Sequence, residues 1–250
     1  MKLKDKVAIV TGGGRDIGRS ASVKLAKEGA KVVVNYHSSE SEAQETLNEI
    51  KANGGEAILV QGDMTKSADV DRLLQETRKA YGDEVHTLVN VVGGLVARKT
   101  LDEMDEDFFN GLMQLNLTST FLSMKAFVPL MKEGASVINF SSLAGRDGGG
   151  AGATAYAASK GAVTTFTRGM AKELGPKGIR VNALCPGLIS TTFHDTFSNP
   201  EGRSKIAGST PLRREGHPDE VGDVVVYLAS AESSFLTGVN LDVNGGLFFS

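Results

Sequence analysis

The hydrophobic positions of this chain fall into short runs that alternate with longer amphipathic stretches. The short runs are rich in β-branched residues, and most are bounded by Gly, Asn, Asp or Ser, as buried strands are. The predicted strands are Val7–Val10, Lys31–Asn35, Ala57–Gln61, Thr87–Asn90, Ser136–Phe140, Arg180–Leu184 and Asn240–Val243. The predicted helices between them are Arg19–Glu28, Glu40–Ala52, Ala68–Tyr81, Asp105–Met131, Ala155–Leu174 and Asp219–Ala229.

Strands and helices that alternate at this spacing predict an α/β fold with a single Rossmann-type, doubly wound parallel sheet and helices on both faces. No repeat, low-complexity tract or linker divides residues 1–250, so we expect one domain. Residues 190–215 follow a predicted strand and form the longest stretch without clear periodicity. Long irregular segments of compact domains are often functional, and we expect a substrate lid at about 190–215.

Composition and charge narrow the range of functions. Hydrophobic residues make up 40% of the chain and charged residues 23%, as in an ordinary globular protein. The net charge of −3 gives no electrostatic footprint for nucleic acid. The single cysteine, Cys185, suits a reducing compartment, and the N-terminal apolar run is too short for a membrane span. We therefore expect a cytoplasmic protein that binds neither nucleic acid nor membrane and holds no metal.

A nucleotide site is expected in the first strand–helix unit. The first predicted strand runs directly into the glycine-rich segment Thr11–Gly18, and a helix follows. Glycines there let the backbone turn tightly and bring N–H groups close to a pyrophosphate at the helix N-terminus. A glycine-rich turn without a ligand is the alternative, but its place in the chain favours a cofactor. The turn residues expected to bind the cofactor are Gly12, Gly14, Arg15, Asp16, Ile17 and Gly18.

Two polar residues follow later strands of the predicted sheet. Asp63 comes after the third strand, and Asn90 ends the fourth. Taken alone, each reads as a cap at a strand end. Because ligands of parallel sheets bind at the carboxyl ends of the strands, we expect Asp63 and Asn90, with their neighbours Met64 and Gly93, to contact the cofactor.

The choice of cofactor depends on the end of the second predicted strand, where an acidic residue would hold the ribose 2′-hydroxyl of NAD. The stretch from Asn35 and Tyr36 to Ser38 and Ser39 contains no carboxylate, and we expect these four residues to bind the cofactor. Arg15 offers a planar fork of donors to a 2′-phosphate. Asp16 in the same turn would repel that phosphate. The sequence predicts a preference for NADPH, with NADH as the alternative.

Tyr156 and Lys160 are the candidate catalytic pair. Their i, i+4 spacing in a predicted helix places the phenol and the ammonium on one face. A nearby ammonium favours phenolate, so we expect it to lower the pKa of Tyr156 from about 10 toward neutrality. Such a phenol is a suitable general acid for a carbonyl that receives hydride. Ser142 ends the run that continues from the predicted strand Ser136–Phe140, at the same edge of the sheet, and could hydrogen-bond the carbonyl oxygen.

The chain resembles the short-chain dehydrogenase/reductase family over nearly its whole length. The turn Thr11–Gly18, the paired serines before Leu143 and the motif Tyr156–Lys160 occur in the order that the family shows, as do segments 179–182, 186–191 and 241–246. The resemblance implies that Tyr156 is the acid/base, that Ser142 orients the carbonyl, and that Lys160 holds the nicotinamide ribose and lowers the Tyr156 pKa.

The resemblance implies further roles around this group. Asn116 matches an asparagine that supports a water leading to the lysine, Asp63 would contact adenine, and Asn90 would contact the adenosine ribose region. The residues expected near the nicotinamide are Pro186, Gly187, Ile189 and Thr191. The family is commonly homotetrameric and acts on small-molecule carbonyl substrates.

Two positions depart from the family pattern. Asp16 stands where the first motif has its middle glycine, which affects how the turn approaches the pyrophosphate and ribose. Val91 stands where the usual Asn-Asn-Ala-Gly has its second asparagine, so the hydrogen bonds of that amide must be replaced. Neither residue belongs to the group Ser142, Tyr156 and Lys160, and we expect activity to survive both changes.

Basic side chains in the loops predict a carbonyl substrate that carries a carboxylate. Arg98, Lys99, Arg146 and His194 fall after the fourth, fifth and sixth strands, on the side of Ser142. Arginine binds carboxylate bidentately, although solvated surface charge is an equal alternative. The expected substrate-binding residues are Arg98, Arg146 and His194. Segments 94–100, 145–150 and 190–197 resemble those of bacterial reductases that convert the alginate-derived 4-deoxy-L-erythro-5-hexoseulose uronate to 2-keto-3-deoxygluconate.

Two other functions remain open. The chain also resembles 3-oxoacyl-acyl-carrier-protein reductases, in which case the basic loops would dock an acidic carrier protein. A non-catalytic binding or regulatory protein with the same nucleotide fold is the third interpretation. Ser142, Tyr156 and Lys160 argue against that one, because nothing in folding requires the trio.

Overall fold

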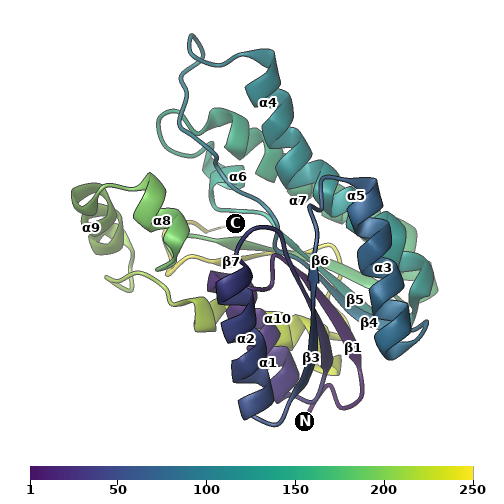
Figure 1. The fold of residues 1–250 in the computed structure, drawn as a ribbon. Helices are drawn as coiled ribbons and strands as arrows, with labels where there is room; N and C mark the ends of the chain where they lie inside the picture. Colours follow the sequence, from purple (N-terminus) through teal and green to yellow (C-terminus); the bar gives the residue numbers. More distant parts are fainter. Residues whose placement is uncertain (250) are drawn as a thin grey trace.

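The computed structural model describes residues 1–249, which form a parallel sheet with helices packed on both faces (Figure 1). The sheet has seven strands in the order β3-β2-β1-β4-β5-β6-β7. The strands are β1 (Val7–Thr11), β2 (Lys31–Tyr36), β3 (Glu56–Gln61), β4 (Val85–Asn90), β5 (Met131–Phe140), β6 (Arg180–Pro186) and β7 (Asn240–Val243). Every neighbouring pair is parallel, which confirms the predicted doubly wound sheet.

The sheet separates two hydrophobic cores, and helices cover the core on each face. One face is covered by α1 (Asp16–Lys27), α2 (Glu40–Ala52) and α10 (Pro218–Ala229), and the other by α3 (Ser67–Tyr81), α5 (Ser119–Phe127) and α7 (Thr154–Leu174). Because side chains alternate along a strand, Val32 and Val34 enter the first core and Val33 the second. Burial on both faces explains why the strands read as continuous apolar runs.

The predicted helix over 105–131 is interrupted in the structure. It consists of α4 (Glu106–Met113), a π-helical turn η1 (Gln114–Thr118), α5, and a 3₁₀ turn η2 (Val128–Leu130). Pro129 lies in that last turn and cannot continue the helix, so β5 begins at Met131, earlier than predicted. The π-helical turn η1 carries Asn116, one of the predicted catalytic residues.

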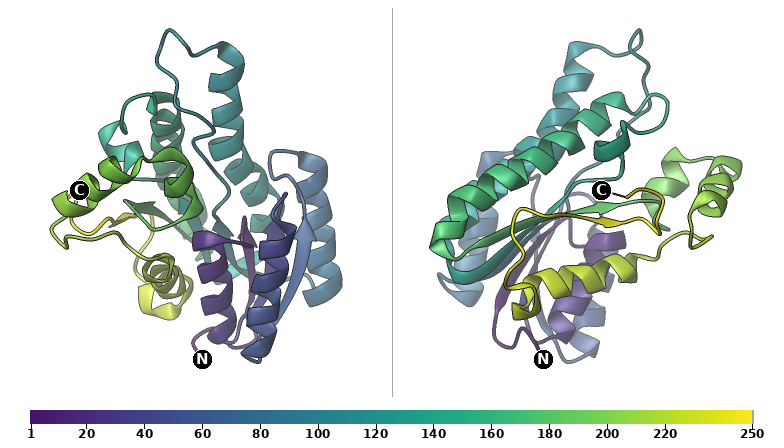
Figure 2. Two further views of the ribbon diagram at one scale, coloured as in Figure 1. Left: turned by 60° about the vertical axis from the view of Figure 1, so that its left-hand side comes forward. Right: turned by 180° about the vertical axis from the view of Figure 1, so that it is seen from behind.

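Residues 190–215, named here the lid segment, are largely helical. They contain α8 (Thr192–Phe197) and α9 (Pro200–Ser209), which extend to one side of the molecule (Figure 2). The two ends of the segment meet between β6 and α10, where Ile189 and Gly216 form an isolated parallel bridge. A short helix α6 (Ala144–Asp147), also absent from the predicted elements, follows β5. Among residues 1–249, no helix is both long and apolar enough to cross a membrane.

Candidate active site

A cavity of about 970 Å³ opens at the carboxyl ends of the strands, between the glycine-rich turn and the lid segment. It lies across β1 and β4, where the strand order reverses from descending to ascending numbers. Ligands of open parallel sheets bind at this switch point. The cavity is therefore placed and sized for a dinucleotide together with a small substrate.

The glycine-rich turn forms one wall of the cavity. Gly12, Gly14 and the residues from Arg15 to Gly18 all line it. Helix α1 begins at Asp16, and its N-cap residue Arg15 supplies no side-chain cap. The first N–H groups of the helix thus have no side-chain cap and belong to residues that line the cavity, which suits the phosphates of a nucleotide. Gly18 has no room for a side chain, since a Cβ there would lie 2.0 Å from the Gly12 carbonyl oxygen.

Most of the predicted cofactor residues line the same cavity. Beyond the turn they are Asn35, Tyr36, Ser38, Ser39, Asp63, Met64, Gly93, Pro186, Gly187, Ile189 and Thr191. Asn35 also braces the turn, because its Oδ1 accepts a hydrogen bond from the Gly12 N–H at 3.1 Å. A single surface thus joins the ends of six strands, β1 to β6, and its residues fit a nicotinamide dinucleotide.

Asn90 is the predicted cofactor residue that the structure places elsewhere. Its side chain is 2% exposed and donates a hydrogen bond to Asn139 Oδ1 at 2.9 Å, inside the sheet. Asn139 in turn donates to Thr167 Oγ1 at 3.0 Å on α7. The side-chain amide thus links β4, β5 and α7 beneath the cavity floor, and a contact of Asn90 with the adenosine ribose region stays a prediction for its backbone.

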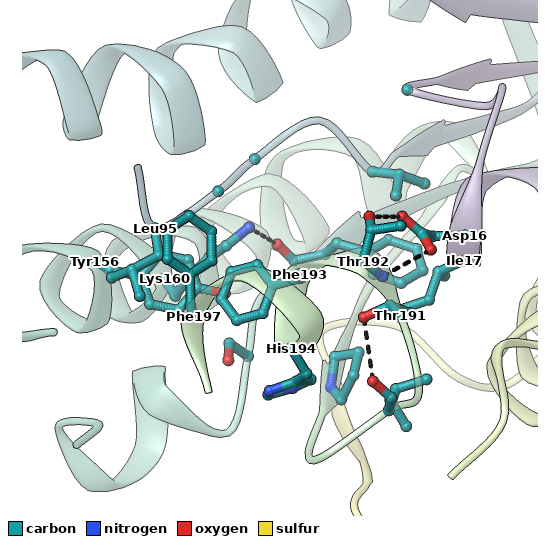
Figure 3. Close-up of a pocket in the computed structure, with 18 of the residues that line it drawn as sticks. Asp16, Ile17, Leu95, Tyr156, Lys160, Thr191, Thr192, Phe193, His194 and Phe197 are labelled. Carbon is teal, nitrogen blue, oxygen red and sulfur yellow. Dashed lines mark hydrogen bonds between the residues drawn. The ribbon is translucent and has the colours of Figure 1, made fainter. Parts of the chain in front are cut away.

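Tyr156 and Lys160 meet on one face of α7 at the cavity wall. The Lys160 ammonium lies 5.9 Å from the centre of the Tyr156 ring and donates to the Phe140 carbonyl oxygen at 2.7 Å. Ser142 follows β5 and also lines the cavity, with its Oγ accepting the Ala144 N–H at 3.1 Å. Figure 3 shows Tyr156 and Lys160 beside Leu95 and the aromatic residues of α8.

Burial determines the ionisation of this pair. It raises the pKa of Tyr156, an effect opposed by a hydrogen bond with Ser142. It lowers the pKa of Lys160 to about 8. The expectation that Lys160 would bring the Tyr156 pKa toward neutrality is therefore wrong for this cavity. Tyr156 is held as a protonated phenol, the form that a general acid needs.

Asn116 lies behind Gly93 rather than in the cavity. It is fully buried, and its side chain brackets Gly94, accepting from the N–H at 2.9 Å and donating to the carbonyl oxygen at 3.0 Å. A Cβ on Gly93 would lie 2.6 Å from Asn116 Oδ1 and 2.7 Å from Lys160 Nζ. Asn116 and the ammonium therefore converge on this glycine, which only a residue without a side chain can occupy.

The lid segment adds an aromatic wall that the predicted site did not include. The Phe193 ring lies 5.9 Å from the Tyr156 ring and 5.1 Å from that of Phe197. Leu95 and Ile206 line the cavity from other elements. The spacing of Phe193 and Phe197, four residues apart, was the available signal for a short helix with one apolar face.

Two of the three predicted substrate-binding residues lie in the cavity wall. Arg98 and His194 line the cavity. Arg98 donates to the carbonyl oxygens of Phe197 and Ala151, at 3.2 and 2.9 Å. Burial, followed by the charge of Arg203, lowers the pKa of His194.

Arg146 is outside the cavity, which overturns its expected substrate contact. It points from α6 toward the edge strand β7, where it donates to the Asn240 carbonyl oxygen at 2.5 Å and lies 3.3 Å from Asp242 Oδ1. Its side chain is 11% exposed, so this guanidinium belongs to the fold and not to a ligand site.

Known proteins match both the sequence and the fold. The sequence model of a family described as enoyl-(acyl carrier protein) reductase matches residues 12–248. An uncharacterized oxidoreductase of Bacillus subtilis, YhdF, is 38% identical over 251 residues, covering 100% of this chain and 86% of the relative. A 3-oxoacyl-[acyl-carrier-protein] reductase of Synechocystis is 37% identical, covering 98% of both chains.

Solved structures agree closely with this one. A short-chain dehydrogenase/reductase from Serratia marcescens superposes with a TM-score of 0.93 at 28% identity, covering 99% of both chains. A dehydrogenase/reductase from Sinorhizobium meliloti gives 0.93 at 29% identity, covering 99% of this chain and 97% of the other. The fold, the site and these matches show that the chain is an oxidoreductase of the short-chain dehydrogenase/reductase family.

Proposed function

We propose that this enzyme reduces the carbonyl group of a small, carboxylate-bearing substrate derived from a sugar, with NADPH as its cofactor. The observation that carries the proposal is the placement of Tyr156 at the cavity wall, between Ser142 and Lys160. A bound nicotinamide would supply the hydride. The chain itself must then supply a proton, a fixed orientation for the carbonyl and a dry surrounding.

Tyr156 would supply the proton. Its phenol is protonated at neutral pH because burial raises its pKa. A carbonyl oxygen placed against Tyr156 and Ser142 receives two O–H donors, which fix its orientation and stabilise the negative charge that develops on it. Lys160 lies behind the phenol and would stabilise the phenolate left after proton transfer, since its ammonium is 5.9 Å from the ring centre.

The preference for NADPH rests on the residues around the expected ribose. Arg15, Ser38 and Ser39 line the cavity and offer donors to a 2′-phosphate. The carboxylate of Asp16 accepts two hydrogen bonds from Thr192, so its charge is directed toward the lid segment. If NADH at equal saturating concentration drove turnover better than NADPH, the preference would be refuted.

The favoured substrate is 4-deoxy-L-erythro-5-hexoseulose uronate, reduced to 2-keto-3-deoxygluconate. Arg98 supports it, because this residue lines the cavity and an arginine carries five N–H donors, more than its two backbone bonds use. A carboxylate beside Arg98 would gain a charge-assisted hydrogen bond. His194 offers a polar group on the same side.

The alternative is 3-oxoacyl-acyl-carrier-protein reduction, the activity named for the Synechocystis relative. The wall formed by Leu95, Phe193, Phe197 and Ile206 favours it, since apolar side chains suit an acyl chain better than a sugar acid.

For assembly we propose a homotetramer in the cytoplasm. The exposed rings of Phe109 and Phe121 on α4 and α5, 38% and 44% exposed, are consistent with a subunit contact.

The test is NADPH oxidation by the purified protein with the uronate and, in parallel, with an acetoacetyl thioester. Turnover of the uronate alone supports the proposal, and turnover of the thioester alone supports the alternative. Tyr156→Phe should lower kcat by roughly 10²–10⁴-fold while cofactor binding persists. Unchanged turnover in that variant would remove the mechanism.

Arg98→Ala separates the two substrate classes. We expect it to raise KM for the uronate roughly tenfold or more, and KM for a neutral aldehyde much less, because both substrates lose the contact of Arg98 with α8 but only the uronate loses a charge-assisted hydrogen bond. The matched control is Arg78→Ala on α3, because Arg78 is exposed and its ion-pair partner is Asp83, away from the cavity. Equal effects of Arg98→Ala on both substrates would exclude carboxylate recognition by this residue.

A further inference from the structure

Asp16 occupies a backbone conformation that favours glycine. Its φ is +50°, in the left-handed region, where a side chain is strained and glycine is not. The family pattern has a glycine at this position, so the carboxylate replaces a residue better suited to the turn. A residue that retains this strain at a functional site is expected to make a compensating contact.

That contact is with the first residue of α8. Asp16 Oδ1 accepts the Thr192 N–H at 3.1 Å, and Oδ2 accepts the Thr192 hydroxyl at 2.5 Å (Figure 3). Arg15 Nη1 donates to the same hydroxyl oxygen at 3.1 Å. The N-cap residue of α8, Thr191, instead donates its hydroxyl to the Ile189 carbonyl oxygen at 3.1 Å. Asp16 therefore caps α8 from a segment remote in sequence.

Helix α8 carries the wall that faces Tyr156. Phe193 follows Thr192 directly, and its ring lies 5.9 Å from the Tyr156 ring. The other end of α8 is held by Arg98, whose Nε donates to the Phe197 carbonyl oxygen at 3.2 Å. The two contacts hold this six-residue helix at both ends against the body of the enzyme.

We propose that Asp16 is a positioning residue that fixes α8, and with it Phe193, over the reacting end of the cavity. Because Asp16 belongs to the turn expected to hold the cofactor phosphates, the same contact couples the order of that turn to the order of the substrate wall. The proposal rests on the proposed function only in taking Tyr156 as the group at which substrate reacts. It does not depend on which carbonyl compound is reduced.

The test is amide hydrogen exchange in the full-length chain, comparing wild type with Asp16→Gly. Glycine adopts the required φ, so this variant should keep the turn while losing both hydrogen bonds. Exchange of the amides in 192–197 should become about fivefold faster, the effect of losing a helix cap. Asp5→Gly is the matched control, since Asp5 is exposed and also has a positive φ of +62°, and it should leave α8 unchanged.

Kinetics distinguish positioning from a direct effect on the cofactor. In Asp16→Gly we expect KM for the carbonyl substrate to rise about fivefold with a smaller change in kcat. The cofactor Kd should not rise. Thr192→Val loses the hydroxyl bond but keeps the backbone N–H bond, so it should show the same pattern more weakly, and Thr192→Ser, which keeps the hydroxyl, should retain wild-type values. Unchanged exchange at α8, or equal weakening of cofactor and substrate binding, would overturn the proposal.

The exchange result is independent of turnover, so failure of the two proposals can be told apart. Tyr156→Phe should leave exchange in 192–197 as in wild type, whatever its activity. Loss of activity in Tyr156→Phe with unchanged exchange in Asp16→Gly would support the catalytic mechanism and refute the positioning role of Asp16.

Discussion

Lys160 is 3% exposed, and its ammonium is held by the carbonyl oxygen of Phe140 at 2.7 Å. Desolvation disfavours its charge and lowers its pKa to about 8. Spacing on one helix correctly predicted that Lys160 would lie beside Tyr156, because helix geometry is local. The pKa directions were not predictable in that way, since they depend on burial beneath β5 and the lid segment.

The stability of the protein should therefore depend on pH through Lys160. The folded pKa of about 8 lies below the ordinary value of 10.5, so between these values the unfolded chain binds a proton that the folded one has lost. Raising the pH through this window favours the folded state, by up to about 1.4 kcal/mol per pH unit. The free energy of unfolding should be measured by denaturant for wild type and Lys160→Met at pH 7 to 10. As the pH rises, the value for wild type should increase relative to the value for Lys160→Met. Parallel curves would contradict this.

At the scale of elements, α6 and β7 are joined by a charge pair that no sequence pattern indicated. Arg146 Nε and Asp242 Oδ1 are 3.3 Å apart, with side chains 11% and 14% exposed, and their geometry is an ion pair without a hydrogen bond. A basic residue after β5 could equally have faced the cavity. Only the placement of β7 beside β6, fixed by contacts distant in sequence, decides where Arg146 points.

Arg146→Ala should consequently destabilise the fold while leaving substrate recognition intact. Removing one member of a nearly buried pair leaves Asp242 uncompensated, and we expect the free energy of unfolding to fall by about 3 kcal/mol. Chemical denaturation measures the loss. Arg98→Ala serves as the reciprocal control, with a changed KM and a nearly unchanged unfolding midpoint. A stable Arg146→Ala variant with a raised KM for the uronate would instead restore a substrate role for Arg146.

At the scale of the whole molecule, the alternation of apolar runs predicted the sheet and its two helical layers because each strand is buried on both faces. The lid segment was the part whose structure could not be predicted. Its helix α8 has only six residues, and its contact with the glycine-rich turn joins Asp16 to Thr192, which are far apart in the chain. Such pairings follow from the assembled fold and leave no periodic signal.

A bound cofactor should stabilise this assembly as a unit. The cavity is lined by the ends of strands on both sides of the β1/β4 switch point and by the lid segment, so a dinucleotide would bridge all three. Binding only to the folded state at a concentration of 100 Kd adds about 2.7 kcal/mol to the free energy of unfolding. Thermal unfolding with graded NADPH and NADH should show a rising midpoint, steeper for NADPH. No shift with either nucleotide would contradict the cofactor site.

The bridge at the base of the lid segment allows that segment to be replaced as a unit by a segment from another protein. The chain leaves and returns at one point, where Ser190 N–H bonds the Gly216 carbonyl oxygen at 2.8 Å and Gly216 N–H bonds that of Leu188 at 2.9 Å. A segment with adjoining ends can be replaced by one of another length at little entropic cost to the rest of the fold. Grafts between these two anchor points could therefore diversify substrate range across a fixed catalytic platform, provided that each begins with a hydroxyl residue able to meet Asp16.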